Sequence, residues 1–149
     1  MGWFDWLRRG PAPIIEHARF GRVRASVRSD GEWLWEVLAP VPTIPGPIDM
    51  TFDAGELGPD ERHSKQLDAI LADRDALTRA AAPMMAADLS DFLERPFPDD
   101  PWDELELEFV HLTGRQGAFE LAYGCKSWPD AHVTAFFEDG LPTMVQIDD

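Results

Sequence analysis

Polar and apolar positions alternate along residues 20–28, where every second residue from 23 to 27 is Val or Ala. A period of two is typical of a strand with one buried face. Residues 32–38 repeat the pattern, and Ser-Asp-Gly at 29–31 supplies turn residues between the two runs. We therefore predict a β-hairpin, followed by a third strand at residues 48–52.

The middle of the chain changes to helical spacing. Gly-Pro-Asp-Glu at residues 58–61 is a good helix start, because acids favour the positive end of the helix dipole. Apolar residues then recur at three- and four-residue intervals from Leu67 to Leu77, and again from Met85 to Leu93. Pro83 lies between the two runs, so we expect either a kink or a pair of consecutive helices.

The last third returns to strand spacing. We predict four strands in a meander, at residues 104–110, 119–123, 133–137 and 144–147. The dipeptide Asp139-Gly140 is the clearest hairpin signal in the chain. The expected fold is therefore α+β, with a mainly antiparallel sheet and the helical pair packed on one of its faces. We expect a single domain over residues 11–149.

Residues 1–10 are predicted to form a short amphipathic helix ahead of that domain. Trp3, Phe4, Trp6 and Leu7 gather its large apolar side chains. Two turns of helix are not stable alone, so these side chains must bury against the domain, a second copy or a membrane. We expect the first two, because only two arginines accompany them and lipid binding would be weak.

Charge narrows the choice of partners. Asp and Glu number 28 against 13 Lys and Arg, which gives a formal net charge of −15. Such a chain repels nucleic acid and attracts basic proteins. A single cysteine, Cys125, forms no internal disulfide, and no apolar stretch is long enough to span a membrane. We expect a cytoplasmic protein that binds neither nucleic acid nor membrane.

Acids are concentrated between residues 88 and 108, where nine of them accompany Arg95 as the one base. Three alternate with apolar residues on the predicted strand and are expected to point into solvent, since burying them would be costly. The run is either a solvated face or a docking surface for a cationic partner. The candidate binding residues are Asp99, Asp100, Asp103, Glu104, Glu106 and Glu108, with Trp102 and Trp128 as exposed anchors.

No motif of a known catalytic or metal site is present, and we expect neither a cofactor nor a metal. His111 continues the alternation of Leu105, Leu107 and Phe109, which predicts that it points inward. His132 follows Asp130 near a predicted loop and could form a small polar site with it or with Cys125.

The C-terminal meander resembles that of small uncharacterised bacterial α+β domains of unknown function. The resemblance is carried by Phe-Glu-Leu-Ala-Tyr at 119–123, residues 128–132, Phe-Glu-Asp-Gly at 137–140 and Val-Gln-Ile-Asp at 145–148. Some of those domains are presumed immunity proteins of toxin systems. The resemblance implies the same fold and assigns no catalytic residue.

Three functions remain open from the sequence. The first is a non-enzymatic, immunity-like domain that docks a basic protein on its acidic surface. The second is a structural module that dimerises through the aromatic side chains of residues 1–10. The third is a hydrolase or small-molecule-binding domain with a site near His132.

Overall fold

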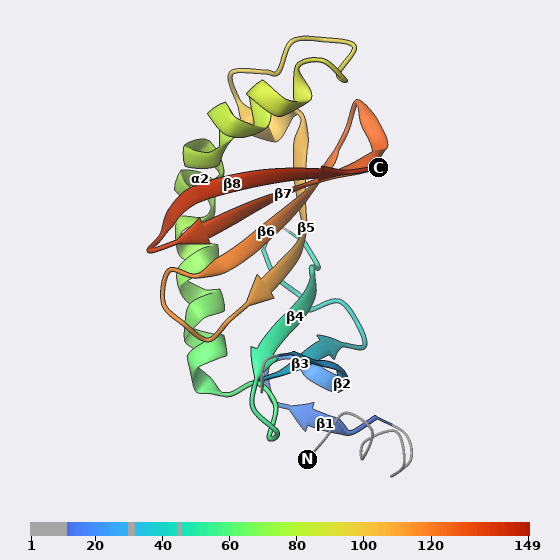
Figure 1. The fold of residues 1–149 in the computed structure, drawn as a ribbon, viewed down its shortest axis with the longest axis vertical. Coiled ribbons are helices and arrows are strands. Elements are labelled where there is room, and N and C mark those ends of the chain that lie inside the picture. Colours follow the sequence, from blue (N-terminus) through green and yellow to red (C-terminus); the bar gives the residue numbers. More distant parts are fainter. Residues whose placement is uncertain (1–11, 30–31, 45) are drawn as a thin grey trace.

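The computed structural model describes residues 12–29, 32–44 and 46–149 (Figure 1). The helix predicted for residues 1–10, with Trp3, Phe4, Trp6 and Leu7, lies outside these ranges. That prediction and the dimerisation that would depend on it therefore stay predictions.

One eight-stranded sheet runs through the described chain, and its spatial order is the same as its order in sequence. Six of the seven neighbouring pairs are antiparallel, which confirms the mainly antiparallel α+β fold. The strands are β1 (Ile14–His17), β2 (Gly21–Ser29), β3 (Glu32–Val37), β4 (Asp49–Ala54), β5 (Leu105–Leu112), β6 (Phe119–Cys125), β7 (Trp128–Glu138) and β8 (Leu141–Asp148).

The pair β4 and β5 is the parallel one, and it joins two antiparallel halves. A parallel pair needs a crossover, and the long helix α2 (Glu61–Leu89) is part of that connection. Figure 1 shows α2 along one face of the second half, with β7 and β8 passing in front of it. The short 3₁₀ helix η1 (Pro101–Asp103) follows and leads into β5.

The predicted helical pair is wrong, because α2 is a single helix of 29 residues that continues through Pro83. Proline removes one backbone donor, but the alanines around it are strong helix formers. Beyond it, Met85 and Leu89 are fully buried and hold the last turns on the sheet. At the other end, Asp60 caps the helix by accepting a hydrogen bond from the Arg62 backbone N–H.

The core lies between the sheet and α2. Its largest fully buried side chains include Trp35, Phe52, Tyr123 and Phe137, which come from both halves of the sheet. The indole Nε1–H of Trp35 donates to the carbonyl oxygen of Gly55 at 3.0 Å, so the turn after β4 closes over this side chain.

Two features of the sheet differ from the predicted strands. The structure has one strand more, β1, which pairs with β2 at the edge and whose sequence Ile-Ile-Glu-His does not alternate. In β5 the register shifts between Leu107 and Phe109, which makes Glu108 the extra residue of a β-bulge. The bulge reverses the faces beyond it, so Val110 and Leu112 are buried and His111 points away from the core. The prediction that His111 points inward is therefore wrong.

Candidate functional site

The face of β4 to β8 that points away from α2 is uncovered by any described helix, and we call it the open face. Six carboxylates alternate on these strands with buried core residues or lie beside the bulge of β5. They are Asp49, Asp53, Glu106, Glu108, Glu120 and Asp148. Strands β4 to β8 contain no lysine and no arginine. The open face is therefore acidic without a compensating strong base.

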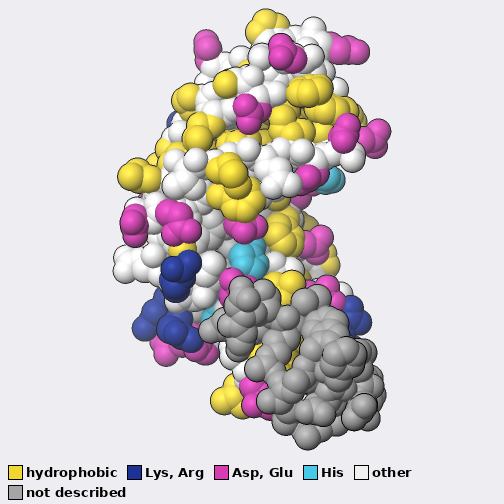
Figure 2. Space-filling model, viewed as in Figure 1, with side chains coloured by type: hydrophobic (Ala, Val, Ile, Leu, Met, Phe, Trp, Pro, Cys, Tyr) yellow, Lys and Arg dark blue, Asp and Glu magenta, His cyan; other side chains and the backbone are white. Residues whose placement is uncertain are grey.

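Hydrophobic side chains occupy the middle of the open face. Phe109 is paired with Ala122 across β5 and β6, and Phe136 is paired with Glu120 across β6 and β7. Both phenylalanines are partly buried. Figure 2 shows acidic side chains scattered among hydrophobic ones over the strands, whereas most Lys and Arg gather near the N-terminal end of α2. An aromatic centre with a charged surround is the usual composition of a protein-binding surface.

One group of polar side chains on this face joins β4, β5 and β6. The Nδ1 atom of His111 lies 2.8 Å from the hydroxyl oxygen of Thr51, and its Nε2 atom lies 3.2 Å from a carboxylate oxygen of Asp53. Both ring nitrogens are satisfied when Thr51 donates to Nδ1 and Nε2–H donates to Asp53. Burial raises the pKa of the neighbouring Glu120, and Asp53 raises it further. His111 lowers this pKa only when its imidazole is protonated, and the net shift is upward.

This group has the residue types of a hydrolytic triad but not the surroundings that one requires. Thr51 lies inside β4, which is hydrogen-bonded to β3 on one side and to β5 on the other. The backbone N–H groups beside it are used in these ladders and cannot form an oxyanion hole. We therefore interpret the contacts of Thr51, Asp53 and His111 as a structural tie across the parallel pair.

A second histidine and carboxylate pair lies further along the open face. The Nδ1 atom of His132 on β7 is 3.2 Å from a carboxylate oxygen of Glu108. The two side chains meet across β6 at Gly124, where a Cβ atom would collide with the Glu108 carboxylate. The bulge in β5 and the glycine in β6 together let Glu108 lie over the neighbouring strand.

The predicted acidic run is divided by the fold. Glu106 and Glu108 are exposed, as predicted, but Glu104 is fully buried. Its carboxylate accepts hydrogen bonds from Arg95 at 2.8 Å and from the backbone N–H and hydroxyl of Ser127 at 2.7 Å each. Burial alone would raise the pKa of Glu104, but the hydrogen bonds from Ser127 and Arg95 outweigh it and lower the pKa. The expectation that Glu104 points into solvent is therefore wrong.

The remaining predicted residues of this run surround η1. Asp99, Asp100 and Asp103 are exposed. Asp100 caps η1 through the backbone N–H of Trp102 and forms an ion pair with Arg79 at 3.2 Å. These acids lie beside α2, away from the open face.

The two predicted tryptophan anchors are both packed against the core rather than presented to a partner. The indole of Trp102 donates to the Asp75 carboxylate at 2.8 Å. Trp128 stacks on Phe92 with 5.1 Å between ring centroids. Their side chains already have partners within the chain, which leaves the phenylalanines of β5 and β7 as the aromatic residues of the open face.

The structure does not bring Cys125 and His132 together. Cys125 is buried in the core on the α2 side of the sheet, whereas His132 pairs with Gly124 and is exposed on the open face. Burial, with Glu104 and Glu108 nearby, raises the pKa of Cys125 to about 11. A thiol with this pKa is largely protonated at neutral pH and is a poor nucleophile.

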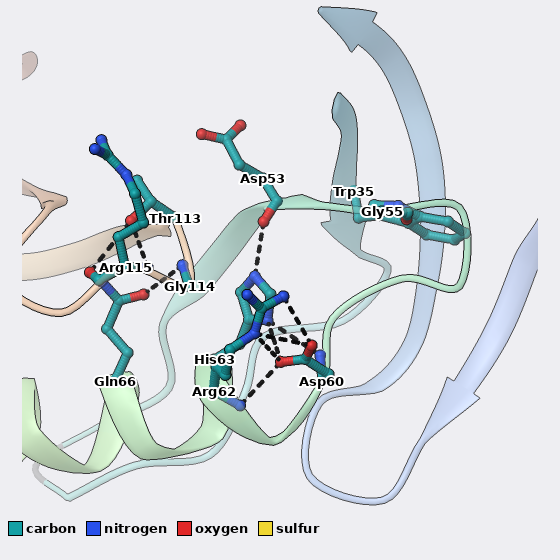
Figure 3. Close-up of polar contacts among 10 residues, drawn as sticks. All are labelled: Trp35, Asp53, Gly55, Asp60, Arg62, His63, Gln66, Thr113, Gly114 and Arg115. Atoms are coloured by element: carbon teal, nitrogen blue, oxygen red, sulfur yellow. Dashed lines mark hydrogen bonds and ion pairs between the residues drawn. The ribbon is translucent and has the colours of Figure 1, made fainter. Parts of the chain in front are cut away.

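In open α/β sheets, ligands bind at the carboxyl ends of the parallel strands. The corresponding place in this chain is at the carboxyl ends of β4 and β5. Here two side chains of α2 occupy it (Figure 3). His63 is 1 % exposed and donates through Nε2 to the carbonyl oxygen of Asp53 at 2.7 Å. The Gln66 amide accepts from Gly114 N–H at 2.9 Å and donates to the carbonyl oxygen of Arg115 at 2.7 Å. These contacts fix the helix to the sheet, and Gln66 and Gly114 also line a pocket of about 520 Å³ beside them.

Sequence reasoning missed the group formed by Thr51, Asp53, His111 and Glu120. In the sequence, the only sign of this group was that alternate residues of β4 are polar. The contact between β4 and β5 was not predictable, because about fifty residues of crossover separate the two strands. Within the described ranges, no three His, Cys, Asp or Glu side chains are arranged to hold a metal ion. No helix of the described chain is long and apolar enough to cross a membrane.

Comparison with models of protein families, with curated proteins and with solved structures found no match to this chain.

Proposed function

We propose that this chain is a non-enzymatic binding domain that docks a basic protein on the open face of β4 to β8. The proposal rests on one observation: five adjacent strands carry acidic residues and no lysine or arginine, and their outer face is not covered by a described helix. A toxin neutralised by an immunity protein is the particular basic partner that the resemblance of the meander suggests.

The charge on this face supports a cationic partner. Glu106 and Asp49 form no ion pair with any described residue, and Glu108 has only the imidazole of His132. Lysine and arginine side chains of a partner would therefore meet carboxylates that the fold has not already neutralised. The partly buried Phe109 and Phe136 provide apolar contact area between these charges.

The test is affinity capture with the immobilised chain, followed by the same capture with two double variants of equal net charge. The face variant carries Glu106→Lys and Glu108→Lys. The control carries Glu61→Lys and Asp88→Lys, both exposed on α2. We expect a basic protein that binds the wild type and the control and that elutes as salt rises, with binding to the face variant reduced at least about 100-fold.

Thermal unfolding of both variants checks that the fold is intact. Capture of the same protein by the face variant and the wild type would contradict docking on the open face. Equal loss with both double variants would show that net charge, and not this surface, governs the interaction.

A further inference from the structure

A groove of about 440 Å³ lies between α2 and the beginning of β5, and Glu106 of the open face is one of its lining residues. It is bounded by α2, by the loop before β4, by η1 and by the beginning of β5. Its apolar lining comes from Ile48, Leu71, Leu105 and Leu107. Three charged side chains, Arg74, Glu106 and Lys126, also line it. The groove therefore combines an apolar wall with two cations and one carboxylate.

The guanidinium of Arg74 is the unusual feature of this groove. It lies over the ring of Trp102, 4.5 Å from the ring centroid, and makes no hydrogen bond or ion pair with any residue that the structure describes. Arg79, five residues further along α2, forms ion pairs with both Asp75 and Asp100. Hydrogen bonds from Arg79 and Trp102 lower the pKa of Asp75, and the nearby charge of Arg74 lowers it further. Asp75 is bonded to Arg79 and Trp102 rather than to Arg74, so the N–H donors of Arg74 have no acceptor among the described residues.

Trp102 holds this guanidinium in a defined position. The indole Nε1–H of Trp102 donates to Asp75 at 2.8 Å, and its backbone carbonyl accepts from the ammonium of Lys126 at 2.7 Å. A ring over the face of a guanidinium does not use the N–H donors, which lie along the edges of the guanidinium. The second cation, Lys126, keeps two further donors beside the same ring.

We propose that this groove binds a small organic monocarboxylate with an apolar body. A carboxylate matches the paired donors along the edge of a guanidinium, and Lys126 adds a second positive charge. The leucine side chains provide the apolar wall that an aliphatic or aromatic body requires. Glu106 disfavours a second negative charge on the ligand, so a dianion binds more weakly than a monoanion.

The probes for the test are benzoate and hexanoate, with benzamide as the neutral analogue and phthalate as the dianion. Each is titrated into the full chain and followed by calorimetry and by the indole N–H resonance of Trp102, identified with Trp102→Phe. We expect benzoate or hexanoate to bind and to shift this resonance. Benzamide should bind at least about tenfold more weakly, since it lacks the charge.

Arg74→Gln and Arg74→Lys test the residue on which the proposal depends. Both should weaken carboxylate binding about tenfold or more, because lysine keeps the charge but loses the paired donors. The matched control is Lys65→Gln on the same helix, which removes one positive charge outside the groove lining and should leave binding unchanged. Thermal unfolding shows which variants are folded. If only one of the two Arg74 variants folds, its carboxylate binding alone tests the proposal.

Three results would overturn the proposal. The first is no binding of either carboxylate at millimolar concentration. The second is equal binding of benzoate and benzamide, and the third is unchanged binding in a folded Arg74 variant. None of them bears on the open face, so this proposal and the proposed function can fail separately.

Discussion

The carboxylates of β1 to β3 and those of β4 to β8 have different neighbours. Strands β1 to β3 contain three arginines and three glutamates, whereas β4 to β8 contain eight acids and no strong base. In the first part Arg24 forms an ion pair with Glu36, and Arg22 lies 3.5 Å from Glu16. In the second part the ion pairs of open-face carboxylates with described residues are those with the two histidines, and neither lysine nor arginine takes part. The first part therefore pairs glutamates with arginines, whereas the carboxylates of the second part have no strong base among the described residues. The proposed docking surface depends on this difference.

The contrast is visible along one row of cross-strand neighbours. Arg24, Glu36, Thr51, His111 and Glu120 follow one another from β2 to β6. Glu36 has an arginine beside it, whereas the pKa of Glu120 is raised by burial and by Asp53, which His111 only partly offsets. Two glutamates on the same row of one sheet therefore have opposite expected effects on stability.

The largest expected effect on the free energy of unfolding comes from replacing Glu104. This residue directly precedes β5, and its carboxylate forms an ion pair with Arg95. Glu104→Ala removes the acceptor for Arg95 and for both donors of Ser127, and should lower the free energy of unfolding by about 2–3 kcal/mol. The loss is limited by solvent screening, because the Arg95 side chain is half exposed. Urea unfolding measures the change, and Glu106→Ala is the control, expected within about 0.5 kcal/mol of wild type.

The stability difference between the wild type and Glu104→Ala should decrease as the pH falls. The pKa of Glu104 in the folded chain is below its usual value near 4.5, so its contribution is complete above that value. As pH falls through the lowered pKa, the carboxylate is protonated and the contribution is lost. The wild type and Glu104→Ala should therefore converge in stability in acid. A difference that is constant from pH 7 to pH 3 would contradict the assigned hydrogen bonds.

Glu120→Gln should act in the opposite direction. The raised pKa of Glu120 means that ionisation of this half-buried group costs folding free energy, beside Asp53 and only partly compensated by His111. The amide removes that charge at nearly constant volume. We expect a stability gain of up to about 1 kcal/mol at pH 7, reduced by solvent screening.

This gain should disappear in acid. The penalty is present above the raised folded pKa and absent below the usual pKa of an unfolded glutamate. Thermal unfolding at pH 7 and pH 4 checks both values. A loss of stability at pH 7 would indicate that Glu120 has a favourable partner and that the open face is better compensated than the structure indicates.

The smallest effect is expected for Glu36→Gln, the matched change in the first part of the row. It weakens an exposed ion pair with Arg24, and should cost about 0.2–1 kcal/mol at low salt. The same measurement at 1 M salt should reduce the loss. Equal signs for Glu36→Gln and Glu120→Gln would remove the distinction between the two parts of the sheet.

Much of the fold was predictable because strand and helix periods are properties of the local backbone. The hairpin of β2 and β3, the start of α2 at Asp60 and the turn at Gly140 all agree with the sequence patterns. The candidate site was less predictable. The acidic strand was recognised, but the bulge at Glu108 changes which later residues face outward, and a bulge leaves no reliable mark in the alternation.

The sequence by itself determined the periodic elements, the excess of negative charge and the lack of strong bases in the last strands. Only the tertiary structure decided which acids remain without a partner. It buried Glu104 against Arg95 and Ser127, placed His111 beside Asp53 and left Arg74 stacked on Trp102. Periodicity follows from backbone geometry within a few residues, whereas the neighbours of a charge depend on which distant strands and helices pack together.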